Sequence, residues 1–203
     1  MFRFRYQYYC AAVAAWAVLA LAACGNTAKP TFLSTDITGV TFGREFKLAD
    51  YNGLTRTLAD FKGKAIVLFF GYTHCPDICP TSMAEIASAM QKLGKDAERV
   101  QVLFITVDPE RDTPETLKQY LSAFNPSFLG LYGDAEATHK IAEEFKIVYQ
   151  KRAGILPDGH TVDHSAGVYI FDPKGQLRLY ASGNGNGGDI LARDIAELLR
   201  TTG

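Results

Sequence analysis

The sequence predicts an α/β domain built in three layers, with helices on both faces of a central mixed sheet. Residues 65–70 form a continuous apolar segment and residues 100–107 a mostly apolar one, and both have the length and composition of strands that are buried on both faces. Each is followed by a segment with helical periodicity or helix-capping residues. A hairpin and a final helix close the chain. Strands that alternate with helices in this way are typical of a sheet covered on both sides.

The first expected elements are a short hairpin and a buried strand. Phe46 and Leu48 precede the turn Tyr51-Asn52-Gly53, which favours a hairpin leading into residues 58–61. The run Ala65–Phe70 then has no polar residue, as expected for the central strand.

A helix is expected from about Pro80 to Leu93. Pro80 suits the first helical position, where its missing N–H costs little, and Gly94 suits the end of the helix. One apolar stripe at helical spacing contains Met83, Ile86, Ala87, Met90 and Leu93. This stripe indicates that the two methionines are core residues rather than thioether ligands.

The second half of the chain continues the alternation. Thr113 and Pro114 form a helix cap, because threonine accepts backbone N–H groups and proline fits the first helical turn. The expected elements are a strand at Val100–Val107, helices at Pro114 to about Phe124 and about Ala135 to Phe145, a hairpin of Val168–Phe171 and Leu177–Ala181, and a helix after Gly188.

The first 23 residues have the pattern of a secretory signal. Arg3 and Arg5 precede an apolar segment, and small residues then lead to Cys24. This arrangement resembles a bacterial lipobox, so we expect cleavage after residue 23 and lipidation of Cys24. The alternative is an uncleaved transmembrane anchor. The apolar stretch Tyr8–Ala23 has 16 residues, however, and a spanning helix needs about 20.

We therefore divide the chain into a signal peptide of lipoprotein type (1–23), a small polar tether (24–36) and the α/β domain (37–203). Removing 23 of the 203 residues also removes two arginines, which changes the net charge from −1 to −3. No basic cluster remains, so nucleic-acid binding has no electrostatic support. The expected location is the periplasmic side of a cell membrane, to which the lipid anchors the domain.

Two cysteines remain as a free pair, Cys75 and Cys79, directly after the expected central strand. A spacing of four places them about one helical turn apart, so both sulfur atoms can face one point. The start of a helix favours thiolate over thiol. Such a pair can bind a soft metal such as Cu(I), exchange disulfides or reduce peroxide.

A metal held by two sulfurs needs a third donor, and the best candidate is His164. With the cysteines at its first strand–helix turn, the expected domain resembles the thioredoxin fold, in which the loop before the hairpin strand faces this turn. Oxidoreductases of that fold usually place a cis-proline there, but residues 161–168 contain no proline. We expect Asp163 to orient the imidazole or to tune its properties as a ligand. Asp77 is expected either to cap the turn or to add negative charge that favours a cation.

Three sequence blocks make the chain similar to the Sco/SenC copper proteins of cytochrome c oxidase assembly. They are CPDICP at 75–80, DPERDTP at 108–114 and VDHS at 162–165. The resemblance covers about Phe42 to Leu199. It implies one copper ion per domain, as Cu(I) or Cu(II), bound by Cys75, Cys79 and His164. It also implies delivery to the copper-binding subunit of the oxidase, with another periplasmic copper chaperone or a thioredoxin-like reductant as further partners.

Two alternative functions use the same cysteines. As a thiol-disulfide oxidoreductase, the chain would use Cys75 and Cys79 as its redox pair to reduce the oxidase cysteines or other periplasmic thiols. The three-residue spacer and the missing proline disfavour this reading, and a binding protein is favoured over an enzyme. A peroxidase is disfavoured because neither cysteine follows a Thr or Ser at the third position before it, and because the only tryptophan, Trp16, lies in the signal.

Overall fold

The computed structural model describes residues 30–153, 160–165, 167–182 and 187–202. Apart from Pro30, these residues belong to one unit, Thr31–Gly203, and the fold below is that of this unit. The expected signal peptide (1–23), Cys24 and the first part of the expected tether lie outside the described residues. Within the described part, no helix is both long and apolar enough to cross a bilayer.

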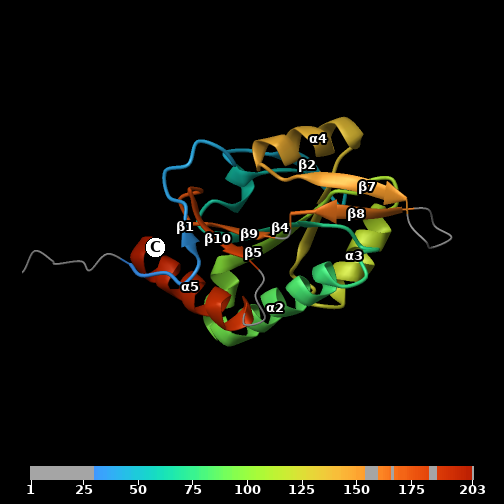
Figure 1. Ribbon diagram of the computed structural model, residues 1–203. Helices are drawn as coiled ribbons and strands as arrows, with labels where there is room; N and C mark the ends of the chain where they lie inside the picture. The colour runs from blue at the N-terminus through green and yellow to red at the C-terminus, as the bar shows by residue number, and fades with distance from the viewer. Residues whose placement is uncertain (1–29, 154–159, 166, 183–186, 203) are drawn as a thin grey trace, which may run out of the picture. The chain divides into compact units, whose positions relative to one another are not determined.

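The middle layer of the described domain is an eight-stranded mixed sheet (Figure 1). Its strands are β1 (Thr35–Asp36), β2 (Lys47–Asp50), β3 (Thr55–Thr57), β4 (Ala65–Gly71), β5 (Val100–Thr106), β6 (Leu129–Tyr132), β9 (Gly167–Phe171) and β10 (Leu177–Ser182). They lie in the order β1-β10-β9-β4-β5-β6-β2-β3. The central strand β4 pairs parallel with β5 and antiparallel with β9, so the sheet is mixed, as expected.

Helices cover both faces of this sheet. Those of the described residues are α2 (Ile78–Leu93), α3 (Pro114–Ser122), α4 (Ala135–Glu144) and α5 (Gly187–Thr202), with 3-10 turns η1 (Leu58–Phe61) and η2 (Gly94–Arg99). In Figure 1, α2 and α5 pack side by side on one face, and α4 lies over the other. The three-layer α/β architecture predicted from the sequence is therefore confirmed.

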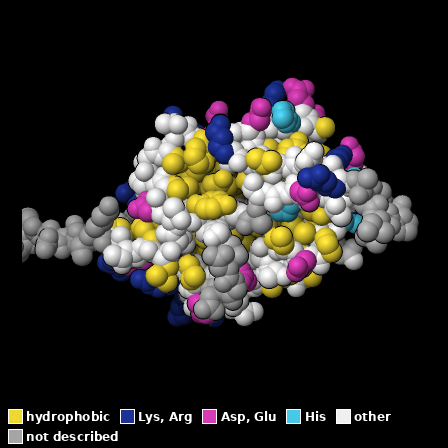
Figure 2. All heavy atoms as spheres, viewed as in Figure 1, with side chains coloured by type: hydrophobic (Ala, Val, Ile, Leu, Met, Phe, Trp, Pro, Cys, Tyr) yellow, Lys and Arg dark blue, Asp and Glu magenta, His cyan; other side chains and the backbone are white. Residues whose placement is uncertain are grey.

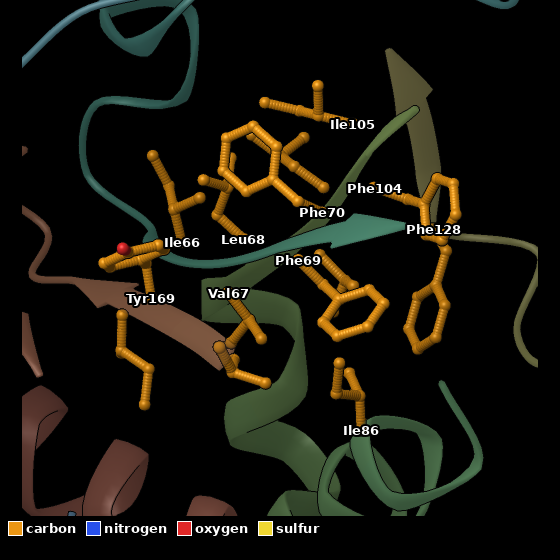
Figure 3. Close-up of a cluster of buried hydrophobic side chains, with 14 of the residues drawn as sticks. Ile66, Val67, Leu68, Phe69, Phe70, Ile86, Phe104, Ile105, Phe128 and Tyr169 are labelled. Atoms are coloured by element: carbon orange, nitrogen blue, oxygen red, sulfur yellow. The ribbon is translucent and has the colours of Figure 1, made fainter. Parts of the chain in front are cut away.

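Strand β4 is buried over its whole length, which explains its continuous apolar sequence. Alternate side chains point to opposite faces, with Phe70 on one side of the strand and Phe69 on the other (Figure 3). Ile86 of α2 packs below Phe69 in the same view. Because helices cover both faces, neither set of side chains reaches water, and the polar–apolar alternation of a half-exposed strand is absent.

The expected start of the helix that follows β4 is corrected by two residues. Asp77 is the N-cap and Ile78 the first helical residue, so Pro80 occupies the third position rather than the first. A proline is still tolerated there, because the N–H groups of the first turn have no intrahelical acceptor. As a consequence, Cys79 lies inside the first turn of α2 and Cys75 lies before it.

The cap expected for α3 is confirmed. The side-chain oxygen of Thr113 accepts the N–H of Thr116 at 3.2 Å, and Pro114 is the first helical residue. The helix ends at Ser122, two residues before the expected end at Phe124. Helix ends commonly differ by this amount, because the last turn has free carbonyls and frays.

Two features of the fold were missed or misplaced by the sequence analysis. β7 (Tyr149–Ala153) and β8 (His160–His164) form a separate antiparallel pair where the sequence predicted only a loop. β1 pairs with β10, so the end of the expected tether belongs to the domain. Both segments are short or mostly polar, and neither shows the apolar pattern by which strands are recognised.

A buried carboxylate joins this N-terminal segment to α5. Asp194 has a fully buried side chain, and its oxygens accept the backbone N–H groups of Leu33 and Ser34 at 2.7 to 3.1 Å. Hydrogen bonds to a charged acceptor are stronger than neutral ones. Asp194 therefore fixes the residues that lead into β1 at the edge of the sheet.

We predict that Asp194→Ala lowers the free energy of unfolding by about 2 kcal/mol or more, because it leaves two backbone N–H groups without their charged acceptor. The matched control is Asp189→Ala on the same helix, where an exposed carboxylate pairs with Lys92. This control should cost less than about 1 kcal/mol. Urea denaturation of both variants measures the difference, and equal losses would contradict the role given to Asp194.

Candidate metal centre

Both cysteines lie at the end of the sheet where β4 leads into α2, and both are free thiols. The Cys79 side chain is fully buried, whereas Cys75 is half-buried. Gly71, the last residue of β4, makes room for this packing. A Cβ at Gly71 would lie 2.8 Å from the Phe69 ring and 3.0 Å from Cys79 Sγ. The absence of a side chain at Gly71 therefore lets the Cys79 sulfur sit directly against the central strand.

The two sulfur atoms share one proton unequally. Donation from the Cys79 thiol is the largest cause that lowers the pKa of Cys75, to about 3; the imidazole of His164 and the backbone N–H groups of Cys79 and Asp77 act in the same direction. The same hydrogen bond, together with burial, raises the pKa of Cys79. The pair therefore carries its negative charge on Cys75, the more exposed sulfur.

His164 is the last residue of β8, and its ring reaches the sulfur pair. Its Nε2 atom lies 3.3 Å from Cys79 Sγ, and its Nδ1 atom lies 3.1 Å from the Ser165 carbonyl oxygen. When a metal binds, a proton on Nδ1 that is donated to this carbonyl leaves the Nε2 lone pair free to act as a ligand. The Phe69 and Tyr72 rings meet the imidazole edge to face, at 6.3 and 5.9 Å between centroids. The ring is thus oriented from several sides.

The three donor atoms are close enough to share one metal ion. The two Sγ atoms and the histidine nitrogen all lie within 4.8 Å of one another. Donors bound to one ion at metal–sulfur distances of ~2.3 Å and metal–nitrogen distances of ~2.0 Å lie about 3 to 4 Å apart. Two thiolates and one imidazole form a soft donor set, which suits Cu(I) better than a hard cation. The residues present therefore fit a single copper ion.

The expected role of Asp163 is corrected. Its carboxylate accepts a hydrogen bond from Arg152 Nε at 2.8 Å, on the exposed side of the β7–β8 pair. Neighbouring residues of a strand point to opposite faces, so Asp163 turns away while His164 turns inward. The Ser165 carbonyl, rather than Asp163, holds the imidazole.

Asp77 contributes through its backbone. Its side chain is exposed and makes no capping hydrogen bond, although it occupies the N-cap position of α2. Its backbone N–H stabilises the Cys75 thiolate. The expected capping role of the Asp77 side chain is therefore wrong, and an N–H group rather than a carboxylate reaches the sulfur.

Asp112 is a site residue that the sequence analysis contained only as part of the block DPERDTP at 108–114, without a role of its own. It is buried and accepts hydrogen bonds from the Thr73 N–H at 3.0 Å and from the Thr73 and Thr106 hydroxyls at 2.6 Å each. It thereby joins the loop that carries the cysteines to the end of β5. Burial is the main cause that raises the pKa of Asp112. Asp112 follows a parallel strand, and functional sites of α/β proteins commonly lie at that end of the sheet. This position could have indicated from the sequence that Asp112 belongs to the site.

Comparison with known proteins identifies relatives over most of the chain. A family model described as SCO1/SenC matches residues 34–200. The mitochondrial protein SCO2 of Saccharomyces cerevisiae is 40% identical over 140 residues, which make up 68% of this chain and 46% of that protein. The chain thus spans about half the length of the first curated relatives that it matches.

Solved structures extend the likeness to the fold. The structure of Bradyrhizobium japonicum ScoI with copper bound is 40% identical, has a TM-score of 0.71, and matches 78% of this chain and 99% of that one. Apo Sco1 from Thermus thermophilus is 40% identical with a TM-score of 0.74, covering 85% and 99% of the two chains. These folds are thioredoxin-like, which confirms the expected fold class. This chain belongs to the SCO1/SenC family.

Proposed function

We propose that this protein binds one copper ion through Cys75, Cys79 and His164 and delivers it to the copper site of cytochrome c oxidase during assembly. The observation that carries the proposal is the convergence of two sulfurs and one imidazole nitrogen within 4.8 Å. The copper bound to B. japonicum ScoI supports copper as the metal. The Sco family is one of cytochrome c oxidase assembly proteins, which supports the oxidase as the destination.

The geometry favours transfer by ligand exchange. Cys75 is half-buried and carries the negative charge of the pair, so it is the sulfur that an incoming cation or a partner thiolate reaches first. Cys79 is fully buried and would bind the ion from the side of the domain interior. Replacing these ligands one at a time by partner thiolates keeps the copper coordinated throughout the transfer, without release into water.

The proposed location follows from the first 24 residues. The pattern of a secretory signal over residues 1–23, followed directly by Cys24, supports a domain outside the cytoplasm that is anchored to a cell membrane by lipid and faces the periplasm. There the copper-binding subunit of the oxidase would be the acceptor. A second periplasmic copper chaperone would be the donor, and a thioredoxin-like protein would keep the cysteines reduced.

A second candidate function is thiol-disulfide exchange, and the thiolate character of Cys75 is the observation that favours it. In that reaction the Cys75 thiolate attacks a partner disulfide and forms a mixed disulfide. Cys79 then loses its proton and attacks Cys75 Sγ, which releases the partner as a dithiol and leaves Cys75 and Cys79 oxidised. The partner gains two electrons, and a reductant of the thioredoxin class restores the pair.

We predict one copper per domain in the wild type and clearly less copper retained against a Cu(I) chelator in Cys75→Ala, Cys79→Ala or His164→Ala, because each change removes one of three donors. His74→Ala is the matched control, since this exposed histidine lies beside Cys75 but its Nδ1 contacts Thr73 Oγ1. Metal analysis after anaerobic loading gives the stoichiometry. Undiminished copper in the His164 variant would remove the third ligand from the proposal.

We predict that Cys75 is alkylated by iodoacetamide at a nearly constant rate between about pH 5 and 7. Its pKa of about 3 lies below this range, so the thiolate is already fully formed. An ordinary thiol, with a pKa of about 8.5, would lose about ten-fold in rate per pH unit over the same range. Mass spectrometry of the peptide that contains Cys75 measures the rate.

Cys79→Ala is the matched variant for this measurement. It removes the largest cause of the lowered pKa, so alkylation of Cys75 at pH 5 should become slower than in the wild type. A ten-fold loss per pH unit in the wild-type protein would show that Cys75 is an ordinary thiol.

A further inference from the structure

The third metal donor lies on a structural element outside the main sheet. Within the described residues, β7 and β8 pair only with each other, and the eight-stranded sheet does not include them. Ladder hydrogen bonds therefore do not fix β8, and hence His164, relative to the cysteines of the β4–α2 turn. The chain ties the His164 end of the hairpin to β9, which begins at Gly167, and side-chain contacts with the rest of the domain position the remainder of β8.

One such contact starts at Asp108, which follows β5 and has a fully buried side chain. Its carboxylate contacts Arg111 Nε at 2.5 Å and His160 Nε2, at the start of β8, at 3.2 Å. The Arg111 side chain is only 16% exposed and also donates from Nη1 to the His160 carbonyl oxygen at 2.9 Å. The first residue of β8 is thus held through both its ring and its backbone.

A second contact runs through Tyr72, next to the cysteine turn. The Arg111 guanidinium lies 5.7 Å from the centroid of the Tyr72 ring, within the range of a cation–π interaction. The Tyr72 hydroxyl oxygen accepts the Val162 N–H from the middle of β8 at 3.2 Å, and the ring packs edge to face on His164. Arg111 therefore touches β8 directly and also supports the tyrosine that holds it.

The same cluster contains a second group of side chains of the types that bind metal ions, but their negative charges are already balanced by neighbouring cations. Asp108, Glu110 and His160 lie close enough together to hold an ion. Arg111 pairs with Asp108, however, and Lys151 of β7 pairs with Glu110 at 2.7 Å. A dication there would have to displace both of these cations. The cluster is therefore an ionic attachment between the segment 108–111 and the hairpin.

We propose that Asp108, Arg111, His160 and Tyr72 form a latch that positions His164 over the two sulfurs. This inference rests on the proposed copper site and assigns a role to the DPER sequence at 108–111. With the latch closed, the imidazole reaches Cys79 and a metal receives three ligands. When the latch is broken, the hairpin moves away from the sheet and the metal keeps only two sulfurs. These are positioning residues, because none of them lies among the three metal donors.

Arg111→Ala is the sharpest test because Arg111 takes part in both contacts: the change removes the hydrogen bond to the His160 carbonyl and the cation–π contact with Tyr72. It leaves the Asp108 carboxylate buried without its cation, which favours opening of the hairpin. Arg152→Ala is the matched control, since this arginine lies on the same hairpin but pairs with Asp163 on the exposed side. Figure 2 shows basic and acidic side chains at the surface over the β7–β8 hairpin, whose place is labelled in the same view in Figure 1. Tyr72→Phe removes only the acceptor of the Val162 N–H.

The first readout uses the metal-free full-length protein in detergent. We expect hydrogen exchange at the Val162 amide to become at least about ten-fold faster in Arg111→Ala and in Tyr72→Phe, and to stay unchanged in Arg152→Ala. Amides of β4 serve as the folding control and should remain protected in all three. Unchanged protection of Val162 in Arg111→Ala overturns the latch, whether or not the protein binds copper.

The second readout is Cu(I) affinity in a double-mutant cycle with His164. Arg111→Ala should weaken binding about 10- to 100-fold in the wild type and less than about two-fold when His164 is already alanine. Equal losses in both backgrounds would show that Arg111 acts on the whole fold rather than through His164, and would overturn the proposal. Failure of the wild type to bind copper would overturn the proposed function instead, leaving the exchange measurement to decide the latch.

Discussion

The contact between the Cys79 sulfur and the His164 imidazole is the interaction on which the site depends. It joins two residues 85 positions apart, at 3.3 Å, and brings a hairpin outside the main sheet against the start of α2. Cys79 is fixed because it lies inside a helix that packs on the buried strand β4. Without His164, Cys75 and Cys79 would form a dithiol pair with no third donor for a metal.

A single loop after β5 holds both halves of the site. Asp112 binds Thr73 and so fixes the loop that carries the cysteines, while Asp108 and Arg111 bind His160 and so fix the hairpin that carries His164. Carboxylates buried at the end of a parallel strand are costly unless they are hydrogen-bonded or paired, and all of these are. The burial of so much charge in one short loop makes sense if the loop orders the metal donors rather than the core.

Local pattern was enough to predict the fold and the cysteine site, but not the contacts that hold the site together. The apolar run of β4, the stripe of α2 and the cap at Thr113 each follow from neighbouring residues, so they could be read directly. Asp112 binds Thr73, 39 positions away, and His160 binds Asp108, 52 positions away, and no spacing rule reveals either contact. Asp163 was misassigned because its strand was taken for a loop, and alternation along β8 turns its carboxylate outward.

The central claim is that one ion is bound by two sulfurs and one nitrogen of this chain. Copper X-ray absorption on the anaerobically purified, copper-loaded protein tests it most directly, because the technique counts ligands by element. The account predicts two sulfur neighbours at ~2.3 Å and one nitrogen at ~2.0 Å, with the multiple scattering that an imidazole produces. A spectrum fitted by sulfur alone, with no imidazole contribution, would contradict it.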